Sequence, residues 1–315
     1  MKTVLITPRA FPAYGKQYIE TLGEMGYEVI VNNDKAPFSR EEFVALAQEA
    51  TGVIVGTEPM GRDLLEKCKN LKAVVRYGVG TDNVDLEFLK ENGIGFDRCA
   101  GSNSVSVAEM AVSFMFMMAK GIPHGADNVR QGRWEKVDGF ELYGKTIGII
   151  GFGDIGRQVA RITSGIGMNV IACAAHPIKE EILAEYNAKN VSSEELISTS
   201  DVISINAPLT DKTRNMIGAP EFKKMKNTAV LVNTARGGIV DDRAVLEALK
   251  TGEIMAYGTD VFGTEPAVYE PWVKELLELP NFILTPHMAS RTVEADMNMT
   301  NMSGERLIRL LKDEK

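Results

Sequence analysis

The sequence predicts an α/β protein with two domains, each built around a parallel sheet. The chain of 315 residues is longer than one hydrophobic core usually serves, which favours two domains. Short β-rich apolar segments alternate with segments of helical period from end to end, and this alternation is typical of βαβ units. One apolar segment is followed by Gly-x-Gly-x-x-Gly and then by a helical segment, which is the order of elements in a Rossmann-type dinucleotide-binding domain.

The first set of elements predicts a five-stranded, flavodoxin-type layer. Its strands are expected near residues 3–7, 28–32, 52–56, 73–77 and 94–97, and its helices near residues 14–25, 40–49 and 63–67. A long apolar helix is expected next, near residues 105–120. This segment contains Glu109 and is shorter than the ~20 apolar residues that a membrane span needs, so we interpret it as a buried helix.

The second set of elements predicts the Rossmann-type domain. Its strands are expected near residues 146–150, 169–172, 202–205, 229–233, 256–260 and 282–284. Helical segments separate these strands, so we expect one sheet of parallel strands with crossover helices.

Composition excludes several classes of function. The 35 Lys and Arg against 43 Asp and Glu give a formal net charge of -8, which works against binding a phosphate backbone, so no nucleic-acid partner is expected. Pro8 ends the N-terminal apolar run too early for a signal peptide, and we expect a cytoplasmic protein with no membrane partner. Cys68, Cys99 and Cys173 form no Cys-x-x-Cys pair, so we expect buried thiols and no metal site.

Each glycine of the turn at residues 151–156 has a physical role. Gly151 permits the tight turn, Gly153 lets the backbone approach a pyrophosphate, and Gly156 lets helix and strand pack closely. The pyrophosphate would lie at the helix N-terminus, where unpaired N–H groups and the helix dipole favour an anion. The strand before this turn and the helical spacing after it favour nucleotide binding over a purely structural turn.

One residue of the expected nucleotide site is missing. An NAD-binding Rossmann domain usually carries Asp or Glu at the end of its second strand, where the acid binds the ribose 2′-hydroxyl. Here Ala174 and His176 occupy that region, and the first acid is Glu180. A 2′-phosphate would meet no repelling acid, but no Arg is supplied to bind it. The cofactor is therefore NAD or NADP, with a slight preference for NAD.

The chain has 3 histidines, and their contexts differ. His124 follows the long apolar helix and is most simply a loop or helix-cap residue. His176 lies where the adenosine ribose is expected. His287 follows the last predicted strand, at the carboxyl end where open α/β sheets bind ligands. We therefore expect His287 to carry any imidazole chemistry, with a structural role as the alternative.

Arg236 and Glu265 also follow strands of this predicted domain. Each residue alone is more often a surface ion-pair residue than a catalyst. Because the carboxyl ends of parallel strands meet at one edge, Arg236, Glu265 and His287 are expected to converge on one crevice.

With these residues in place, the sequence resembles a known family, the D-isomer-specific 2-hydroxyacid dehydrogenases, and most closely their phosphoglycerate dehydrogenase-like branch. The resemblance covers nearly the whole chain. Its ordered motifs lie at residues 75–85, 101–109, 151–156, 206–209, 233–241, 260–266 and 285–287.

The resemblance implies hydride transfer between C4 of a nicotinamide and C2 of a small D-2-hydroxy acid or 2-oxo acid. The family's catalytic Arg, Glu and His match Arg236, Glu265 and His287. His287 would give or take the hydroxyl proton, and Glu265 would favour the protonated ring. Arg236 would hold the substrate carboxylate or carbonyl through its planar donor fork.

The resemblance also implies binding residues. The cofactor-binding set is Val79, Gly151, Gly153, Asp154, Ile155, Gly156, Ala174, His176, Ala207, Pro208, Thr234, Ala235, Arg236, Asp260, His287, Ala289 and Ser290. The substrate-binding set is Arg76, Tyr77, Gly78, Val79, Gly80, Arg236 and His287, with the backbone of residues 77–80 on the substrate carboxylate.

A discontinuous first domain is a further implication of the resemblance. Residues 1–99 and 289–315 would form the substrate-binding domain and residues 100–288 the dinucleotide-binding domain, with the substrate between them and a hinge that closes over it. The resemblance also implies a homodimer formed through the long helix. The helix methionines Met110, Met115, Met117 and Met118 have an alternative interpretation as core residues.

Departures from the family pattern leave the substrate open. Glu58 lies in a loop where some phosphoglycerate enzymes use a basic residue, whereas Arg76 and Arg291 are additional cations. 3-Phosphoglycerate is therefore one candidate substrate, and hydroxypyruvate or glyoxylate is the alternative. A non-catalytic, nucleotide-sensing corepressor on the same scaffold is an interpretation from a different class.

Overall fold

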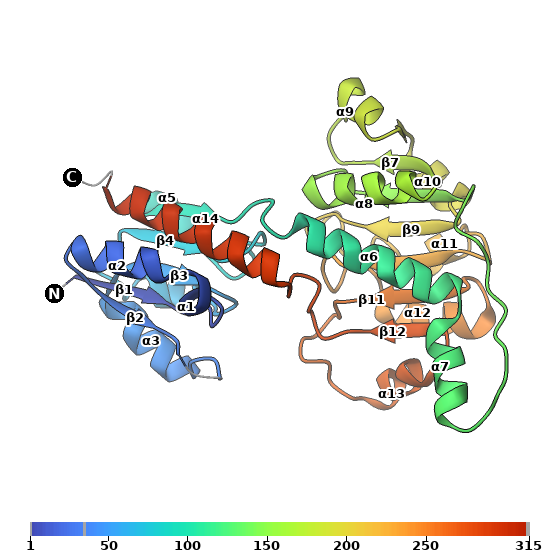
Figure 1. Ribbon diagram of the computed structural model, residues 1–315, viewed down its shortest axis with the longest axis horizontal. Helices are drawn as coiled ribbons and strands as arrows, with labels where there is room; N and C mark the ends of the chain where they lie inside the picture. The colour runs from blue at the N-terminus through green and yellow to red at the C-terminus, as the bar shows by residue number, and fades with distance from the viewer. Residues whose placement is uncertain (1, 34–35, 313–315) are drawn as a thin grey trace. The chain divides into compact units, whose positions relative to one another are not determined.

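The computed structural model of the chain describes residues 2–33 and 36–312 (Figure 1). The chain divides into two compact units: unit 1 is Met1–Asn103 with Arg291–Lys315, and unit 2 is Ser104–Ser290. The expected boundaries, after residues 99 and 288, fall a few residues before the observed ones. Unit 1 is discontinuous in the sequence, whereas unit 2 is one stretch of chain.

Unit 1 contains a five-stranded parallel sheet, as predicted, with the flavodoxin strand order β2-β1-β3-β4-β5. The strands are β1 (Lys2–Ile6), β2 (Tyr27–Val31), β3 (Ala50–Val55), β4 (Ala73–Arg76) and β5 (Gly95–Arg98). The helices are α1 (Phe11–Tyr14), α2 (Lys16–Glu24), α3 (Arg40–Glu49), α4 (Arg62–Leu65), α5 (Leu86–Glu91) and α14 (Val293–Lys312). The six-residue α5 lies outside the predicted helices, because it is too short to show a helical period.

Helix α14 completes the core of unit 1. It packs on β3, β4 and β5. Its Leu307 and Leu311 are buried in one cluster with Val4 and Ile54 of the sheet. Gly52 makes this approach possible, because a Cβ there would lie 3.2 Å from a methyl carbon of each leucine. The last helix of unit 1 is therefore part of its core rather than an appendage.

Unit 2 contains a parallel sheet of seven strands in the order β12-β11-β10-β9-β6-β7-β8. The strands are β6 (Thr146–Ile150), β7 (Asn169–Cys173), β8 (Ala188–Asn190), β9 (Val202–Ile205), β10 (Val230–Asn233), β11 (Ala256–Thr259) and β12 (Phe282–Leu284). The helices are α6 (Ser104–Ala119), α7 (Ile122–Arg130), α8 (Asp154–Gly165), α9 (Glu180–Glu185), α10 (Ser193–Thr199), α11 (Ala219–Phe222), α12 (Asp242–Thr251) and α13 (Pro271–Glu278). The predicted Rossmann-type sheet is confirmed with one strand more, β8, whose three mostly exposed residues carry no apolar pattern.

The long helix α6 lies in the core of unit 2, where it packs on α8, β10 and β11. Phe114, Met115 and Met118 are buried, and Met110 and Met117 are half-buried. The interpretation of these methionines as core residues is therefore confirmed for Met115 and Met118. Among the described residues, no single helix is long and apolar enough to cross a membrane, and α6 passes such a test only together with α7, at a bend of 64°.

His124 lies in the first turn of α7, whose N-cap is Gly121, so the prediction of a loop or helix-cap residue at this position is wrong. The helix begins directly after Gly121, which has φ +58°, and Pro123 lies in its first turn. Proline is compatible with this position, because the first N–H groups of a helix have no intrahelical acceptor. The Gly-Ile-Pro sequence at residues 121–123 therefore changes the direction of the chain and begins a second helix, α7.

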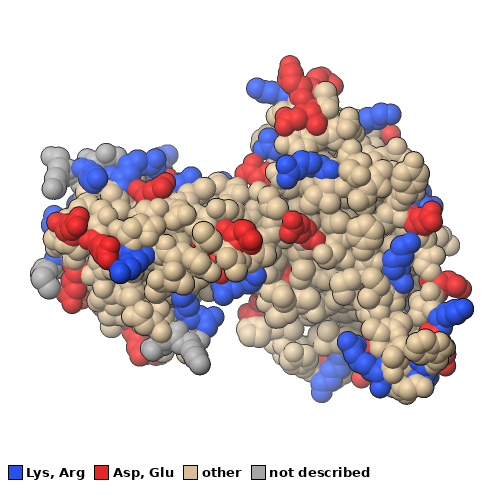
Figure 2. Space-filling view, viewed as in Figure 1, with Lys and Arg blue, Asp and Glu red and all other residues tan. Residues whose placement is uncertain are grey.

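Charged side chains of both signs are interspersed over the visible face of each unit (Figure 2). Unit 1 also has ion pairs near its surface, such as Arg62 with Asp85 at 3.3 Å and with Glu91 at 3.1 Å. Exposed pairs of this kind contribute little to stability, because water and salt screen them. The stability of each unit therefore comes mainly from its buried apolar clusters.

Replacing Leu307 with alanine tests the contribution of α14 to unit 1. The substitution Leu307→Ala removes a fully buried side chain and is expected to cost about 2–5 kcal/mol of unfolding free energy. Leu86→Ala is the matched control, because Leu86 is exposed on α5 and its truncation should change stability by less than about 0.5 kcal/mol. Urea denaturation measures both values, and equal losses would show that α14 does not complete the core.

Candidate functional site

Four loops of unit 2 follow the carboxyl ends of neighbouring strands. Strands β9, β10, β11 and β12 lie next to one another and run parallel. The loops that follow them carry, in order, Asn206, Arg236, Glu265 and His287. Because parallel strands end at the same edge of a sheet, the fold brings these four loops to one edge.

Glu265 and His287 form a hydrogen-bonded pair at this edge. Glu265 Oε2 lies 2.5 Å from His287 Nδ1. Glu265 Oε1 accepts a hydrogen bond from the N–H of Phe262 at 3.1 Å, so both carboxylate oxygens are engaged. The His287 side chain is 49% exposed. Because Nδ1 is held by the carboxylate, Nε2 is the ring nitrogen that can exchange a proton with a ligand.

The pairing changes the proton affinity of both groups. The hydrogen bond to Glu265 raises the pKa of His287 above its ordinary value, although burial and the charge of Arg236 oppose this rise. Burial opposes ionisation of Glu265, but the hydrogen bond with His287 and the nearby positive charges lower the pKa of Glu265 below its ordinary value. His287 therefore stays protonated to a higher pH than a free imidazole does, beside an ionised carboxylate.

His287 has a left-handed backbone conformation, with φ +51°, which non-glycine residues adopt at a cost of about 1–3 kcal/mol. Asp260 stabilises it. The carbonyl of Asp260 accepts the His287 N–H at 3.0 Å. The Asp260 carboxylate accepts the N–H of Met288 at 2.9 Å and of Ala289 at 2.7 Å, together with the hydroxyl of Thr285.

The sequence predicts Asp260 as a cofactor contact, and the structure gives it a second role as the anchor of the loop that carries His287. Asp260 is only 1% exposed. A buried carboxylate needs hydrogen-bond donors, and this loop supplies them from its backbone and one hydroxyl. The orientation of His287 therefore depends on the end of the neighbouring strand. The cofactor contact of Asp260 stays a prediction.

The Arg236 loop is packed backbone to backbone against the loop that leads to Glu265. A Cβ at Gly237 would overlap the carbonyl of Phe262, so only glycine fits there. Asn233 holds the other side of the loop, because its side-chain amide donates to the Arg236 carbonyl at 3.0 Å. The Arg236 guanidinium donates to the carbonyl of Ala235 at 2.7 Å. Its charge influences both Glu265 and His287, as their pKa shifts show.

The glycine turn after β6 has the form of an anion cradle. Gly151 has φ +93°, and a Cβ there would lie 2.7 Å from the Asn206 carbonyl. A Cβ at Gly156 would overlap the carbonyl of Gly151, whereas a Cβ at Gly153 would meet nothing within 4 Å. The turn leads into α8 at Asp154, and no side chain among the described residues caps that helix. The first N–H groups of α8 and the open space beside Gly153 therefore fit a pyrophosphate.

Two buried polar atoms lie at the adjacent strand ends. Thr234 Oγ1 and Asn206 Oδ1 have no hydrogen-bond partner among the described residues. Buried polar atoms are normally paired, so both atoms fit positions that a bound nucleotide would satisfy. Thr234 belongs to the predicted cofactor set, as do Ala207 and Pro208, which follow Asn206. Asn206 is absent from the predicted cofactor set, although it begins the motif at residues 206–209 and its place directly after β9 is the signal that could have identified it.

The remaining predicted cofactor residues differ in their surroundings. Ala174 and His176 are exposed in the segment that follows β7. The observed strand extends to Cys173. Ala289 is buried, and its carbonyl accepts the hydroxyl of Ser106 at 2.6 Å. Ser290, the last residue of unit 2, is half-buried. The structure thus orders the loop after His287 but leaves the segment after β7 open to solvent.

The loop at residues 76–80 of unit 1 presents backbone donors. Gly78 has φ +138°, and its N–H donates to the Arg76 carbonyl at 2.9 Å. Across the part of the chain that the structure describes, no acceptor takes the N–H of Val79 or Gly80. Two such donors side by side suit a carboxylate. The Tyr77 side chain is buried and hydrogen-bonded to α14, so only its backbone stays a candidate for substrate binding.

Three other predicted polar residues of unit 1 have partners. The Arg76 guanidinium donates to Asn83 Oδ1 at 3.2 Å and also to the carbonyl of Tyr77. The Glu58 carboxylate accepts the hydroxyl of Thr7 at 2.7 Å. Arg291 lies 3.8 Å from the carboxylate of Asp296. Each of these side chains therefore has a structural contact besides any role in binding.

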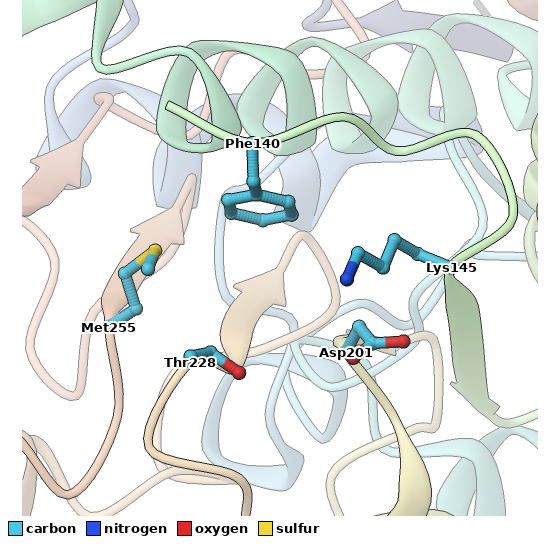
Figure 3. A pocket seen from close by; sticks show the side chains of 5 residues that line it. All are labelled: Phe140, Lys145, Asp201, Thr228 and Met255. Atoms are coloured by element: carbon cyan, nitrogen blue, oxygen red, sulfur yellow. The ribbon is translucent and has the colours of Figure 1, made fainter. Parts of the chain in front are cut away.

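A shallow hollow lies at the opposite, amino-terminal edge of the unit 2 sheet (Figure 3). Its lining residues are Phe140, Lys145, Asp201, Thr228 and Met255. Asp201 forms an ion pair with Lys226 at 2.8 Å and accepts the N–H of Thr146. The hollow contains none of the predicted site residues, and its one carboxylate is already paired, so we do not assign it to the site.

A Rossmann-type sheet with a glycine cradle after its first strand defines the class of dinucleotide-binding α/β proteins. The comparisons identify the family. The model of the family described as "D-isomer specific 2-hydroxyacid dehydrogenase, NAD binding domain" matches residues 112–289. The chain belongs to the D-isomer-specific 2-hydroxyacid dehydrogenase family, as the sequence resemblance predicts.

Relatives within this family carry different names. The D-3-phosphoglycerate dehydrogenase of Archaeoglobus fulgidus is 36% identical over 94% of this chain and 56% of its own length. This chain therefore spans about half the length of that relative. The glyoxylate reductase of Thermococcus litoralis is 35% identical over 100% of this chain and 95% of its own length.

A solved structure extends the comparison to the fold. The D-lactate dehydrogenase of Aquifex aeolicus, complexed with NAD and lactic acid, has a TM-score of 0.84 and 26% identity. The match covers 99% of this chain and 96% of that chain. The fold of this chain is therefore that of a protein whose structure contains NAD.

Replacing Glu265 with glutamine should lower the pKa of His287. The variant Glu265→Gln removes the negative charge at 2.5 Å from the ring, so we expect a fall of about one pKa unit or more. A ring with a lower pKa loses its proton at lower pH. Proton NMR titration of the imidazole measures the change. Glu270→Gln is the control, because Glu270 pairs with Arg243 rather than with the ring, and an unchanged His287 pKa in Glu265→Gln would contradict the pairing.

Proposed function

We propose that the protein is an oxidoreductase that transfers a hydride between a nicotinamide cofactor and C2 of a small D-2-hydroxy acid or 2-oxo acid. The observation that carries the proposal is the 2.5 Å contact between Glu265 and His287. It lies at the carboxyl edge of the same sheet that holds the glycine cradle, where open α/β sheets bind nucleotides. Membership in a family named for this reaction supports it.

His287 serves as the acid in reduction and as the base in oxidation. The nicotinamide, when bound, supplies the hydride to C2 of the oxo acid. The ketone oxygen then takes one proton from His287 Nε2, so the carbonyl becomes a hydroxyl and the ring becomes neutral. The Nδ1 proton stays on the hydrogen bond to Glu265, whose ionised carboxylate stabilises the imidazolium before transfer.

Arg236 stabilises negative charge on the substrate in this proposal. Its planar guanidinium can donate two parallel hydrogen bonds to a carboxylate, or one to an oxygen that becomes an alkoxide. The packed Gly237 backbone fixes the loop, so the position of the side chain is set by two neighbouring loops. The pH dependence follows from the pKa of His287: reduction should slow, and oxidation should accelerate, as pH rises through that value.

For the substrate, we propose a short 2-oxo acid. 3-Phosphohydroxypyruvate, the oxo form of 3-phosphoglycerate, is the first candidate, because Arg76 and Arg98 stand at paired positions at the ends of β4 and β5. Hydroxypyruvate and glyoxylate are the alternative. They are favoured by the Glu58 carboxylate beside Thr7, a charge that would repel a phosphate, and by the relative named glyoxylate reductase.

For the cofactor, we propose NAD, with NADP tolerated. The segment after β7 carries neither an acid to bind the ribose 2′-hydroxyl nor an arginine to bind a 2′-phosphate, since its residues from Ala174 to Lys179 include only His176 and Lys179 as polar groups. The family description names NAD.

A cytoplasmic location also remains our proposal.

Replacing His287 with glutamine tests the proposed function. His287→Gln should abolish oxidation of NADH by any acid of a panel of 3-phosphohydroxypyruvate, hydroxypyruvate, glyoxylate and pyruvate, because no acid remains at Nε2. Binding of NADH, followed by its fluorescence, should be nearly unchanged. The control His124→Gln alters a histidine in the first turn of α7 and should keep full activity.

The outcomes distinguish the alternatives. Turnover that survives in His287→Gln would refute the assigned role. Saturable NADH binding by the unaltered protein, without oxidation by any of the acids, would favour the nucleotide-sensing corepressor. Repeating the assay with NADPH decides the cofactor preference.

We also propose a homodimer. The family resemblance implies that it forms through the long helix α6, and we propose that the segment from α7 to β6, which follows α6, belongs to the same interface. This segment exposes Trp134 by 88% and Tyr143 by 77%, together with Ile122 and Val129 of α7. Large aromatic side chains exposed on one segment are typical of protein interfaces. A second copy of this chain is the expected partner, because most soluble oligomers are symmetric homo-oligomers.

Introducing a charge at Trp134 should break this dimer. Trp134→Glu places a carboxylate in the proposed apolar interface, and the molar mass measured by light scattering during size-exclusion chromatography should fall to one half. Met297→Glu is the control, because Met297 is exposed on α14 of unit 1, outside the segment. A monomeric unaltered protein, or an unchanged mass in Trp134→Glu, would contradict the proposal.

A further inference from the structure

The loop that carries Glu265 is held by a carboxylate outside the predicted site. Asp242, in the first turn of α12, accepts the N–H of Gly263 on its Oδ2 atom at 2.9 Å. The preceding N–H, that of Phe262, donates to Glu265 itself at 3.1 Å. The N–H groups of Phe262 and Gly263 are thus held by two different carboxylates. That of Glu265, which accepts the Phe262 N–H, also binds His287.

We propose that Asp242 is a positioning residue for Glu265, which sets the contact between Glu265 and His287 through the backbone of Gly263. This inference rests on the proposed function for its consequence in turnover. Asp242 makes no contact with the ring, so it acts only through the loop. It belongs to no set of residues that the sequence or the family resemblance predicts.

The loop has little freedom to compensate for the loss of this contact. On one side, the Gly237 backbone lies so close to the Phe262 carbonyl that a Cβ would overlap it. On the other side, a Cβ at Gly263 would lie 2.9 Å from Asp242 Oδ2. The loop is therefore clamped between the Arg236 loop and the start of α12. Removing Asp242 opens one side of the clamp, and the loop can then move away from His287.

The charge of Asp242 makes the contact strong. A carboxylate accepts a backbone N–H about twice as strongly as a neutral group does. Burial raises the pKa of Asp242 to about 6, against the hydrogen bond from Gly263, and the charge of Asp241 adds to the rise. Burial also raises the pKa of Tyr257, and the charge of the Asp242 carboxylate adds to that rise. At pH 7.5 Asp242 is therefore mostly ionised.

Asp241 has a different task, which separates the two neighbouring carboxylates. It is the N-cap of α12 and accepts the N–H groups of Arg243 and Ala244 at 3.1 and 3.2 Å. Because Asp241 caps the helix by itself, Asp242 is not needed as a cap. Its contact with Gly263 is then directed at the loop rather than at the helix.

The pKa of His287 in the protein without substrate tests this inference. The chain has 3 histidines, so their NMR titration curves are few, and the curve that disappears in His287→Gln belongs to His287. Asp242→Ala should lower the pKa of His287 by about half a unit to one unit, because Glu265 no longer stays at contact distance. The titrations of His124 and His176 should not change. Asp242→Asn retains an oxygen that accepts the Gly263 N–H, and it should keep most of the His287 shift.

Turnover gives the second measurement. With the best acid of the panel, Asp242→Ala should lower kcat about tenfold and leave the KM for NADH unchanged, whereas Asp242→Asn should recover most of kcat. Glu195→Ala is the matched control, since Glu195 is also an acidic residue in the first turn of a helix, α10, but lies outside the loop. It should change neither the His287 pKa nor kcat.

Each outcome decides the inference. An unchanged His287 pKa in Asp242→Ala overturns it, even if kcat falls. A lowered His287 pKa in a protein that reduces no acid supports the positioning role and refutes the proposed function instead. If Asp242→Ala does not fold, Asp242→Ser replaces it, because the shorter hydroxyl keeps a polar group there but cannot span the distance to Gly263.

Discussion

The buried carboxylate of Asp260 is the interaction on which the arrangement of the site depends. It lies directly after β11 and accepts hydrogen bonds from Thr285, Met288 and Ala289, which follow β12. Burying an ionised group is unfavourable unless donors satisfy it, and here the donors belong to the loop that must be held. The same bonds stabilise the left-handed conformation of His287. The backbone strain at His287 therefore depends on the Asp260 carboxylate that holds the loop.

Much of the site could be predicted from the sequence, because its chemistry follows strand ends. Arg236, Glu265 and His287 are polar residues in the loops that follow apolar strands, and the glycine turn has a fixed spacing. The anchors could not be predicted in the same way. An acidic residue such as Asp242 is common in the first turn of a helix, because its negative charge interacts favourably with the helix dipole. Its contact with a distant loop therefore has no signal in the sequence.

The errors in the predicted fold have the same physical origin. Strand β8 has three residues, and α5 has six. Elements this short are formed by tertiary contacts rather than by a periodic apolar pattern. His124 was predicted as a loop or helix-cap residue because it follows the long apolar helix, yet Gly121 and Pro123 are compatible with the start of a new helix there. The long apolar helix α6 was therefore predicted and these short elements were not, but the 20-residue α14 was also absent from the predicted helices.

The discontinuity of unit 1 determines the order in which the chain can fold during synthesis. The buried Leu307 and Leu311 of α14 leave the ribosome after all of unit 2, although they pack on Val4 and Ile54. Unit 2 is continuous, so it can fold as soon as its own sequence has emerged. Until α14 has been synthesised, the N-terminal strands of unit 1 expose an apolar face. Aggregation, and the need for a chaperone, is therefore greatest in this interval.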